Sequence, residues 1–246
     1  MKRKILILIV LLLTSAYLVV AVTVFNDAPA TRECEGIELT IKDSIDNGFV
    51  TPADIQQLIK KKKLLPIKKQ QQDIDVRQLE EILDEHPFVK KAECYLTSGG
   101  KVAIDIYQRI PILRVMSSNG DDYFVDSEGK IMSAPGRSVH VVVATGSIDR
   151  SFAQAQLYEL GTYLHTDRFW ESQIEQIHVT PQKELELVPR VGSHIIFFGK
   201  PGDYSEKFAK LQTFYKKALN QVGWNKYSRI SIEFTNQIIC TKKEKN

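Results

Sequence analysis

The feature that most restricts the fold of this chain is a long apolar run near its N-terminus. Residues 5–24 contain no charged side chain over 20 positions. At about 1.5 Å per residue, a helix of this length spans roughly 30 Å, the thickness of the hydrocarbon core of a bilayer. The run therefore predicts a single transmembrane helix, with Ile5, Leu12 and Val20 among the residues of the membrane anchor.

A cleaved signal peptide is the alternative interpretation of this run. The apolar core of a signal peptide usually has about 7–15 residues, so the greater length favours a retained anchor. The basic residues Lys2, Arg3 and Lys4 precede the run, and no basic cluster of that kind follows it. The positive-inside rule then predicts a cytoplasmic tail over residues 1–4 and a C-terminal part on the periplasmic or extracytoplasmic side of the inner (plasma) membrane. Residues 25–34 are predicted to be a linker.

The next part of the chain, residues 35–111, is predicted to contain one strand, two short helices and a β-hairpin, in that order. The strand is indicated by alternating apolar and polar residues, the helices by N-cap residues before an apolar face, and the turn by adjacent glycines. The elements are expected at residues 37–41, from residue 51, from residue 75 to 86, and around a turn at 98–100, with the last strand ending in Arg109, Ile110 and Pro111.

A second unit, residues 112–241, is predicted to be richer in strands, and residues 242–246 form a basic tail. Amphipathic helices are expected at 152–164 and 204–222, where apolar residues recur at helical spacing. The strand signals comprise a hairpin around residues 126–129, a buried strand in the sequence VHVVVATG, three strands at 174–179, 184–189 and 194–198, and two terminal strands separated by a break at 235–237. With both units combining helices and strands, the chain is predicted to be an α+β protein.

The charge balance and the cysteines exclude several classes of protein. The net charge of +3 is small for 246 residues, so it does not indicate a nucleic-acid partner. Cys34, Cys94 and Cys240 are far apart, which fits neither a disulfide framework nor a zinc site. At most one disulfide could form, and free thiols are the favoured interpretation.

No motif in the sequence predicts catalysis, a cofactor or a metal. The five histidines are too far apart for a helical metal pair, and neither a phosphate-binding loop nor a nucleophile elbow occurs. The glycines of GKPGDY, residues 199–204, are expected to form a turn between a strand and a helix. We therefore do not expect an enzyme. A terminal strand can instead leave an unpaired sheet edge, which is a template for a partner strand.

Four stretches carry more specific patterns. They are HPFVKKAECYLTSGGKVAIDIYQRIPILRV, DDYFVDSEGKIM, HIIFFGKPGDYSEKFAKLQTFY and ISIEFTNQIIC. The first contains an Arg-x-Pro strand end at Arg109 and Pro111, and the second contains an Asp-x-x-Gly turn. In this order, the stretches resemble the bacterial cell-division proteins FtsQ and DivIB, and the resemblance covers nearly the whole chain.

The resemblance implies a polypeptide-transport-associated (POTRA) domain with β-α-α-β-β order, followed by a mixed α/β "β domain". It also implies a non-enzymatic scaffold at the division septum that binds FtsB-like and FtsL-like membrane proteins, with other division proteins as possible partners of the POTRA domain. In the family, FtsB adds a strand beside the last strand, where Phe234 and Asn236 match family positions and Ile238 and Ile239 follow. Glu233 departs from members that have a basic residue at this position.

Two other functions stay open on sequence grounds. A different membrane-anchored POTRA protein, acting in outer-membrane protein assembly or secretion, would share residues 39–115, but such proteins normally repeat the module or lead into a barrel. No second copy of the module is visible in the sequence. An anchored periplasmic enzyme is the third alternative, and a bound metal or a hydrolytic activity would favour it.

Overall fold

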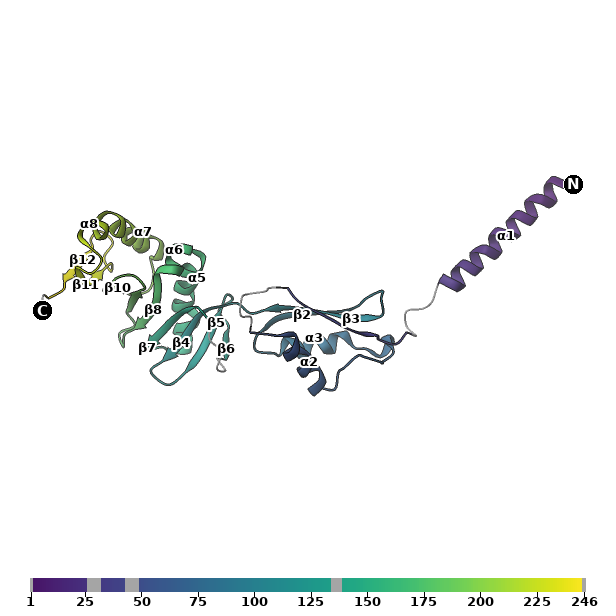
Figure 1. Ribbon diagram of the computed structural model, residues 1–246, viewed down its shortest axis with the longest axis horizontal. Helices are drawn as coiled ribbons and strands as arrows, with labels where there is room; N and C mark the ends of the chain where they lie inside the picture. The colour runs from purple at the N-terminus through teal and green to yellow at the C-terminus, as the bar shows by residue number, and fades with distance from the viewer. Residues whose placement is uncertain (1, 26–31, 43–48, 134–138, 245–246) are drawn as a thin grey trace. The chain divides into compact units, whose positions relative to one another are not determined.

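The computed structural model describes residues 2–25, 32–42, 49–133 and 139–244. Its contacts divide the chain into two compact units, residues 1–108 and 109–246 (Figure 1). The sequence placed a domain boundary after Pro111, a few residues later. In the structure, Pro111 is the first residue of a strand of the second unit.

The N-terminal helix α1 runs over Lys2–Phe25. Within the described part of the chain, none of the helices combines the length and apolar character needed to span a bilayer. The predicted membrane anchor over residues 5–24 therefore stays a prediction. Most of the predicted linker, residues 26–31, lies outside the described residues.

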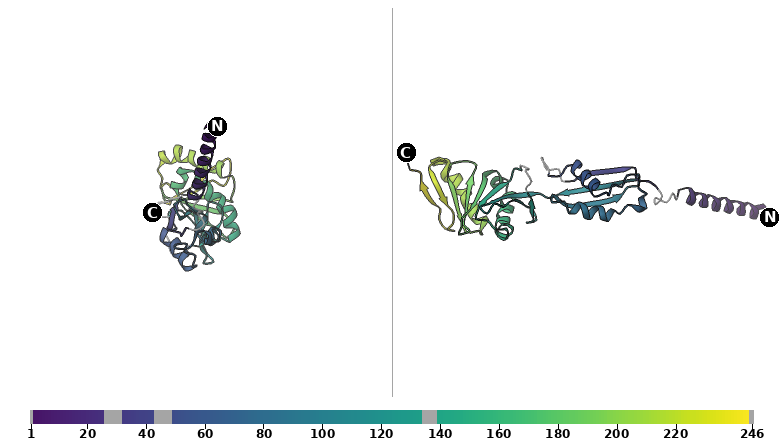
Figure 2. Two further views of the ribbon diagram at one scale, coloured as in Figure 1. Left: turned by 90° about the vertical axis from the view of Figure 1, so that its right-hand side faces the viewer. Right: turned by 90° about the horizontal axis from the view of Figure 1, so that it is seen from below.

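The first unit contains a three-stranded sheet with two helices on one side (Figures 1 and 2). The sheet has the order β1-β3-β2, in which β1 is parallel and β2 antiparallel to the central strand β3. The elements follow the predicted order strand, helix, helix, strand, strand. They are β1 (Gly36–Ile41), α2 (Pro52–Lys61), a 3-10 turn (Gln71–Asp73), α3 (Val76–Asp84), β2 (Val89–Leu96) and β3 (Lys101–Gln108).

Both helices begin at the residues that the sequence predicted. The Thr51 hydroxyl accepts a hydrogen bond from the Asp54 amide at 3.2 Å, and the Asp54 carboxylate accepts one from the Thr51 amide at 3.0 Å. This reciprocal capping box satisfies two amides of the first turn that have no partner within the helix. At α3, the Asp75 carboxylate accepts from the Gln78 amide at 3.0 Å. The helices bury Ile55, Ile59, Leu79 and Leu83 against the sheet.

The central strand β3 is buried on both faces. Its sequence, in which Val102, Ile104 and Ile106 alternate with Ala103, Asp105 and Tyr107, predicts one buried and one exposed face. Ala103 and Asp105 are 5% and 7% exposed, although they were expected to face solvent. The reason is tertiary, because side chains from the segments on either side, Lys42 after β1 and Tyr95 of β2, reach over the face that carries Asp105. The Asp105 carboxylate is partnered, with the Lys42 ammonium at 3.1 Å and the Tyr95 hydroxyl at 3.5 Å.

The second unit is built on one nine-stranded sheet with the order β12-β11-β10-β9-β8-β7-β4-β5-β6. The neighbours β4, β7 and β8 run parallel, as do β10 and β11, and the other pairs are antiparallel. The strands are β4 (Pro111–Ser117), β5 (Asp122–Asp126), β6 (Ile131–Ser133), β7 (Val142–Gly146), β8 (Ile174–Val179), β9 (Leu185–Pro189), β10 (Ile195–Gly199), β11 (Tyr227–Ser231) and β12 (Ile239–Lys242).

The helices of this unit gather on one face of the sheet (Figure 1). Each of the two predicted helices continues through a π-helical turn, and the helix α6 was not predicted. Asp167 caps α6 by accepting from the Phe169 and Trp170 amides, and the helix buries Trp170. The segments are α4 (Arg150–Phe152), a π turn (Ala153–Leu157), α5 (Tyr158–Thr166), α6 (Arg168–Gln173), α7 (Tyr204–Phe214), a π turn (Tyr215–Leu219) and α8 (Asn220–Val222).

Aromatic side chains fill the space between these helices and the sheet. Trp170, Phe198, Phe208 and Tyr215 are at most 2% exposed, and the ring centroids of Trp170 and Phe208 lie 4.7 Å apart. The sequence predicts core positions for Phe197, Phe198, Phe208, Phe214 and Tyr215. The structure confirms this for Phe198, Phe208 and Tyr215, whereas Phe214 is only partly buried. Phe197 is also only partly buried and lies under the Arg229 guanidinium at 4.2 Å.

Candidate docking edge

The terminal strand β12 lies at one edge of the nine-stranded sheet. Within that sheet it pairs only with β11, in a register that places Ile239 opposite Ser231 and Cys240 opposite Ile230. An edge strand presents one row of backbone donors and acceptors to its neighbour and a second row away from the sheet. The outer row of β12 is therefore available for pairing.

The hydrogen bonds at the end of β12 indicate which amides form this outer row. The Lys243 amide donates to the Lys226 carbonyl at 3.1 Å, toward β11. Since amide direction alternates along a strand, the amides of Cys240 and Lys242 point away from the sheet. Among the side chains that the structure describes, none accepts a hydrogen bond from these two amides.

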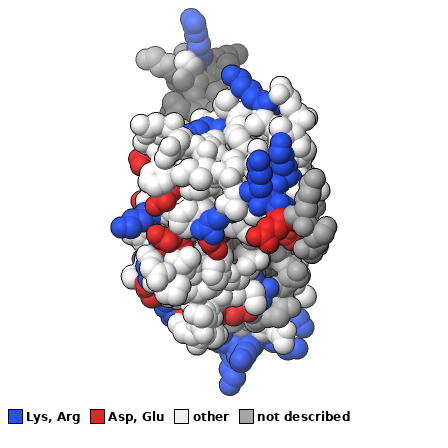
Figure 3. Space-filling view, turned by 90° about the vertical axis from the view of Figure 1, so that its left-hand side faces the viewer, with Lys and Arg blue, Asp and Glu red and all other residues white. Residues whose placement is uncertain are grey.

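Apolar side chains flank the free edge on both faces. Ile239 is 48% exposed, and Phe234 in the preceding turn is 47% exposed. Ile238 and Cys240 pack in part against the core. Figure 3 faces the side of this unit that carries β11 and β12, and it shows uncharged surface interrupted by separate acidic and basic patches. A partner on this face would therefore meet charges of both signs rather than a field of one sign.

The family resemblance implied that Phe234 and Asn236 lie on the terminal strand, but in the structure they do not. They lie in the turn between β11 and β12, because β11 ends at Ser231 and β12 begins only at Ile239. The turn is held by the Lys210 ammonium of α7, which donates to the Phe234 carbonyl. Ile238 directly precedes β12, and Ile239 is its first residue. The four predicted residues thus lie before or at the first residue of β12, at one end of this edge strand.

The Arg-x-Pro strand end and the Asp-x-x-Gly turn meet in the second unit. The Arg109 guanidinium donates to the Asp126 carboxylate at 2.8 Å, and the Asp126 residue is only 1% exposed. The other oxygen of this carboxylate accepts from the Glu128 and Lys130 amides at 2.9 and 2.8 Å. Pro111 lies opposite Asp126 in the β4–β5 register. Both motifs therefore stabilise the first hairpin of this unit.

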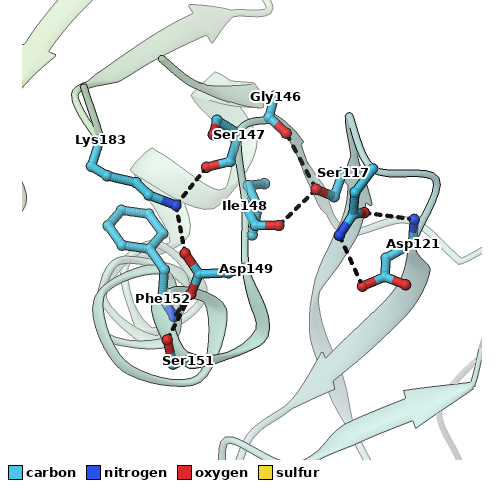
Figure 4. Close-up of polar contacts among 10 residues, drawn as sticks. Ser117, Asp121, Gly146, Ser147, Ile148, Asp149, Ser151, Phe152 and Lys183 are labelled. Carbon is cyan, nitrogen blue, oxygen red and sulfur yellow. Dashed lines mark hydrogen bonds and ion pairs between the residues drawn. The ribbon is translucent and has the colours of Figure 1, made fainter. Parts of the chain in front are cut away.

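A second polar cluster joins the ends of the parallel strands (Figure 4). The Asp149 carboxylate accepts from the Lys183 ammonium and the Ser151 hydroxyl, each at 2.6 Å, and from the Phe152 amide at 2.9 Å. The Lys183 ammonium also donates to the Ser147 carbonyl at 2.9 Å. The bond from Lys183, followed by those from Ser151 and Phe152, lowers the pKa of Asp149 well below its usual range. The cluster therefore links the loop after β7 to the loop after β8 and stabilises both.

This lowered pKa predicts an acid-sensitive contribution to stability. A depressed carboxyl pKa stabilises the folded state above the unfolded value of about 4, and the effect is lost as the pH falls through the folded value. The free energy of unfolding of Asp149→Asn should therefore be lower than that of the unchanged protein at pH 6, and the difference should shrink by pH 2. Urea unfolding at both pH values checks this, and a difference that does not change with pH would contradict it.

The described residues contain no group of three or more histidine, cysteine or acidic side chains that could hold a metal ion. All three cysteines are free, with Cys34 and Cys94 buried and Cys240 half-buried. Burial raises the pKa of the Cys94 thiol to about 12, so this thiol stays protonated and unreactive at neutral pH.

Comparison with known proteins gives two matches to family models. A model described as "FtsQ/DivIB, C-terminal related" matches residues 110–241, more than half of the chain. A model described as a "POTRA-like domain" matches residues 32–107. No curated protein matches the chain. The two matched ranges correspond closely to the two compact units.

Proposed function

Because the chain belongs to the FtsQ/DivIB C-terminal-related family, we propose that it is a non-enzymatic scaffold of the bacterial division complex. In this proposal the protein is held in the inner (plasma) membrane at the septum, with residues 1–4 in the cytoplasm and the part of the chain after the anchor outside it. It binds FtsB-like and FtsL-like membrane proteins, and the partner adds a strand to the free edge of β12. The POTRA-like unit is the proposed contact for further division proteins.

The free edge of β12 is the observation that carries this proposal. Its outer amides have no side-chain acceptor within the described chain, and Ile239 beside them is about half exposed. A partner strand would pair with these amides and cover the apolar side chains on either side, which is the usual mode of β-strand addition. Phe234 lies at the start of this edge, where an aromatic side chain can act as an anchor for the partner.

Replacing an outer amide of β12 tests the docking mode directly. Cys240→Pro removes an outward amide of β12, and Ile238→Pro removes the amide of the residue that directly precedes this strand. Each places a ring beside the edge where the partner strand would lie. Each should weaken capture of an FtsB-like partner by roughly 10- to 100-fold, since a buried backbone group left without its hydrogen-bond partner costs about 1–3 kcal/mol. Capture by the full-length protein and its thermal unfolding should be measured on the same variants.

Thr241→Ala is the matched control for these two variants. Thr241 is exposed on the same strand, and its substitution keeps every backbone amide. Capture should stay within a few-fold of that of the unchanged protein. If the proline variants still capture the partner while folded, strand addition at β12 is wrong.

The proposed membrane anchor rests on the sequence of α1 and on the exposure of its side chains. Residues 5–24 carry no charge. Leu11, Leu12 and Leu13 are each 65% exposed, and Tyr17 is 73% exposed. Exposed apolar surface costs about 25 cal/mol per Å² in water, and a bilayer would remove this cost. Three basic residues before the run support a cytoplasmic N-terminus.

The anchor can be tested by topology and extraction. A reporter that is active only outside the cytoplasm, fused after Asn246, should be active, and the protein should stay with the membrane fraction at high salt. Recovery of a soluble form that begins near Thr31 would contradict the anchor. Replacing Leu12 and Leu13, which lie near the centre of the run, with lysine should reduce membrane retention, because each charge at mid-bilayer costs about 2.5–3.5 kcal/mol.

A further inference from the structure

The edge strand β2 of the POTRA-like unit differs from β12, because side chains of the neighbouring helix accept hydrogen bonds from two of its outer amides. The Ala92 amide donates to the Asp84 carboxylate at 2.7 Å, and the Cys94 amide donates to the Glu80 carboxylate at 2.7 Å. Both acceptors lie on α3. Both bonds are short, as is typical of hydrogen bonds to a charged acceptor.

The register of the hairpin shows that these amides belong to the outer row of β2. The Thr97 amide donates to the Lys101 carbonyl at 2.8 Å, toward β3. Alternation along the strand then directs the amides of Cys94 and Ala92 away from β3. Their side chains are buried, at 6% and 3% exposure, so the strand cannot rotate to hide these groups elsewhere.

The spacing of helix and strand explains how two carboxylates can serve two amides. Residues four apart on a helix lie on the same face and about 6 Å apart along its axis. Residues two apart on a strand lie about 6.6 Å apart and direct their amides the same way. The spacing of the Glu80 and Asp84 carboxylates along α3 is therefore close to the spacing of the Cys94 and Ala92 amides along β2. The carbonyl acceptors of a neighbouring strand would have a similar spacing.

We infer that Glu80 and Asp84 close the β2 edge against antiparallel pairing with a second copy of this chain. An eight-residue edge strand with exposed Tyr95 and Leu96 at one end is otherwise a template for another strand. A second copy always carries the same edge, and two-fold pairing of identical strands is self-complementary. The inference concerns the first unit alone and does not depend on docking at β12.

Removing the two acceptors from the full-length protein in detergent tests this inference. Glu80→Ala/Asp84→Ala should form dimers at protein concentrations at which the unchanged protein is monomeric by light scattering. Adding Cys94→Pro should abolish the dimer, since proline removes an outer amide. Glu81→Ala/Glu85→Ala is the matched control, because it removes the same charge from α3 and its C-cap without touching β2. It also removes the exposed Lys62–Glu85 ion pair, and it should stay monomeric. A folded double variant that stays monomeric would overturn the inference.

Amide exchange in the unchanged protein provides a second test that needs no variant. The amides of Ala92 and Cys94 should exchange at rates similar to those of Glu93 and Tyr95, which face β3. Exchange of Ala92 and Cys94 as fast as in an unstructured chain would show that the carboxylates do not hold this edge, and would overturn the inference even if the double variant failed to fold.

Discussion

Replacing Ile104 with aspartate should unfold the POTRA-like unit. Ile104 is fully buried at the centre of β3, opposite Leu39 of β1 and Cys94 of β2. An unpaired carboxylate at such a position costs several kcal/mol, a large part of the roughly 5–15 kcal/mol that stabilises a domain. We expect the amide signals of this unit to lose their dispersion, while those of the second unit keep theirs.

Lys101→Asp provides the control for Ile104→Asp. Lys101 begins the same strand and is exposed, so a carboxylate there stays in water. The free energy of unfolding of this unit should then lie within about 1 kcal/mol of its value in the unchanged protein. Equal destabilisation by the two changes would mean that charge, rather than burial, determines the outcome.

Gly146→Ala should strongly destabilise the second unit. Gly146 ends β7 with a φ of +99°, and an added Cβ would lie 2.2 Å from the Val179 carbonyl oxygen of the neighbouring strand. The Gly146 carbonyl also accepts from the Ser118 amide at 2.8 Å, so the backbone cannot shift freely. We expect a loss of about 3 kcal/mol or more, which lowers the melting temperature by roughly 10 °C.

Gly120→Ala separates the two causes of this effect. Gly120 has a similar φ of +92°, but nothing lies within 4 Å of an added Cβ. The same backbone strain without the clash should cost about 1 kcal/mol. If calorimetry gives equal losses for the two variants, the close approach of β7 and β8 is not responsible.

The elements of the first unit could be predicted because their signals are local. The capping residues Thr51 and Asp75 act within one helical turn, and the adjacent glycines of the hairpin act within one turn. Helix α6 was missed because it is short and its apolar side chain, Trp170, is explained only by the core that it joins. The burial of Asp105 was missed for a similar reason, since it depends on the strands beside β3.

For the candidate docking edge, too, the sequence indicated the local features and the tertiary structure decided the rest. The sequence indicated a terminal strand with a break before it, and the family resemblance implied which residues lie beside a partner. It could not show that β12 pairs with β11 alone at the sheet edge, or that Phe234 lies in a turn held by Lys210. Sheet order depends on contacts between residues far apart in the chain, which no local pattern encodes.

By itself, the sequence determined the order of the elements, the uncharged N-terminal run and the motifs that led to the family. Each of these depends on residues within a few positions of one another, where backbone preference and side-chain periodicity act directly. Only the tertiary structure decided which strand edges are open. No pattern in the sequence assigns a role to Glu80 or Asp84, and they acquire one only where α3 lies beside β2. The edge of β12 is open because no described side chain lies where it could accept from the outer amides, and that is a property of the packed fold.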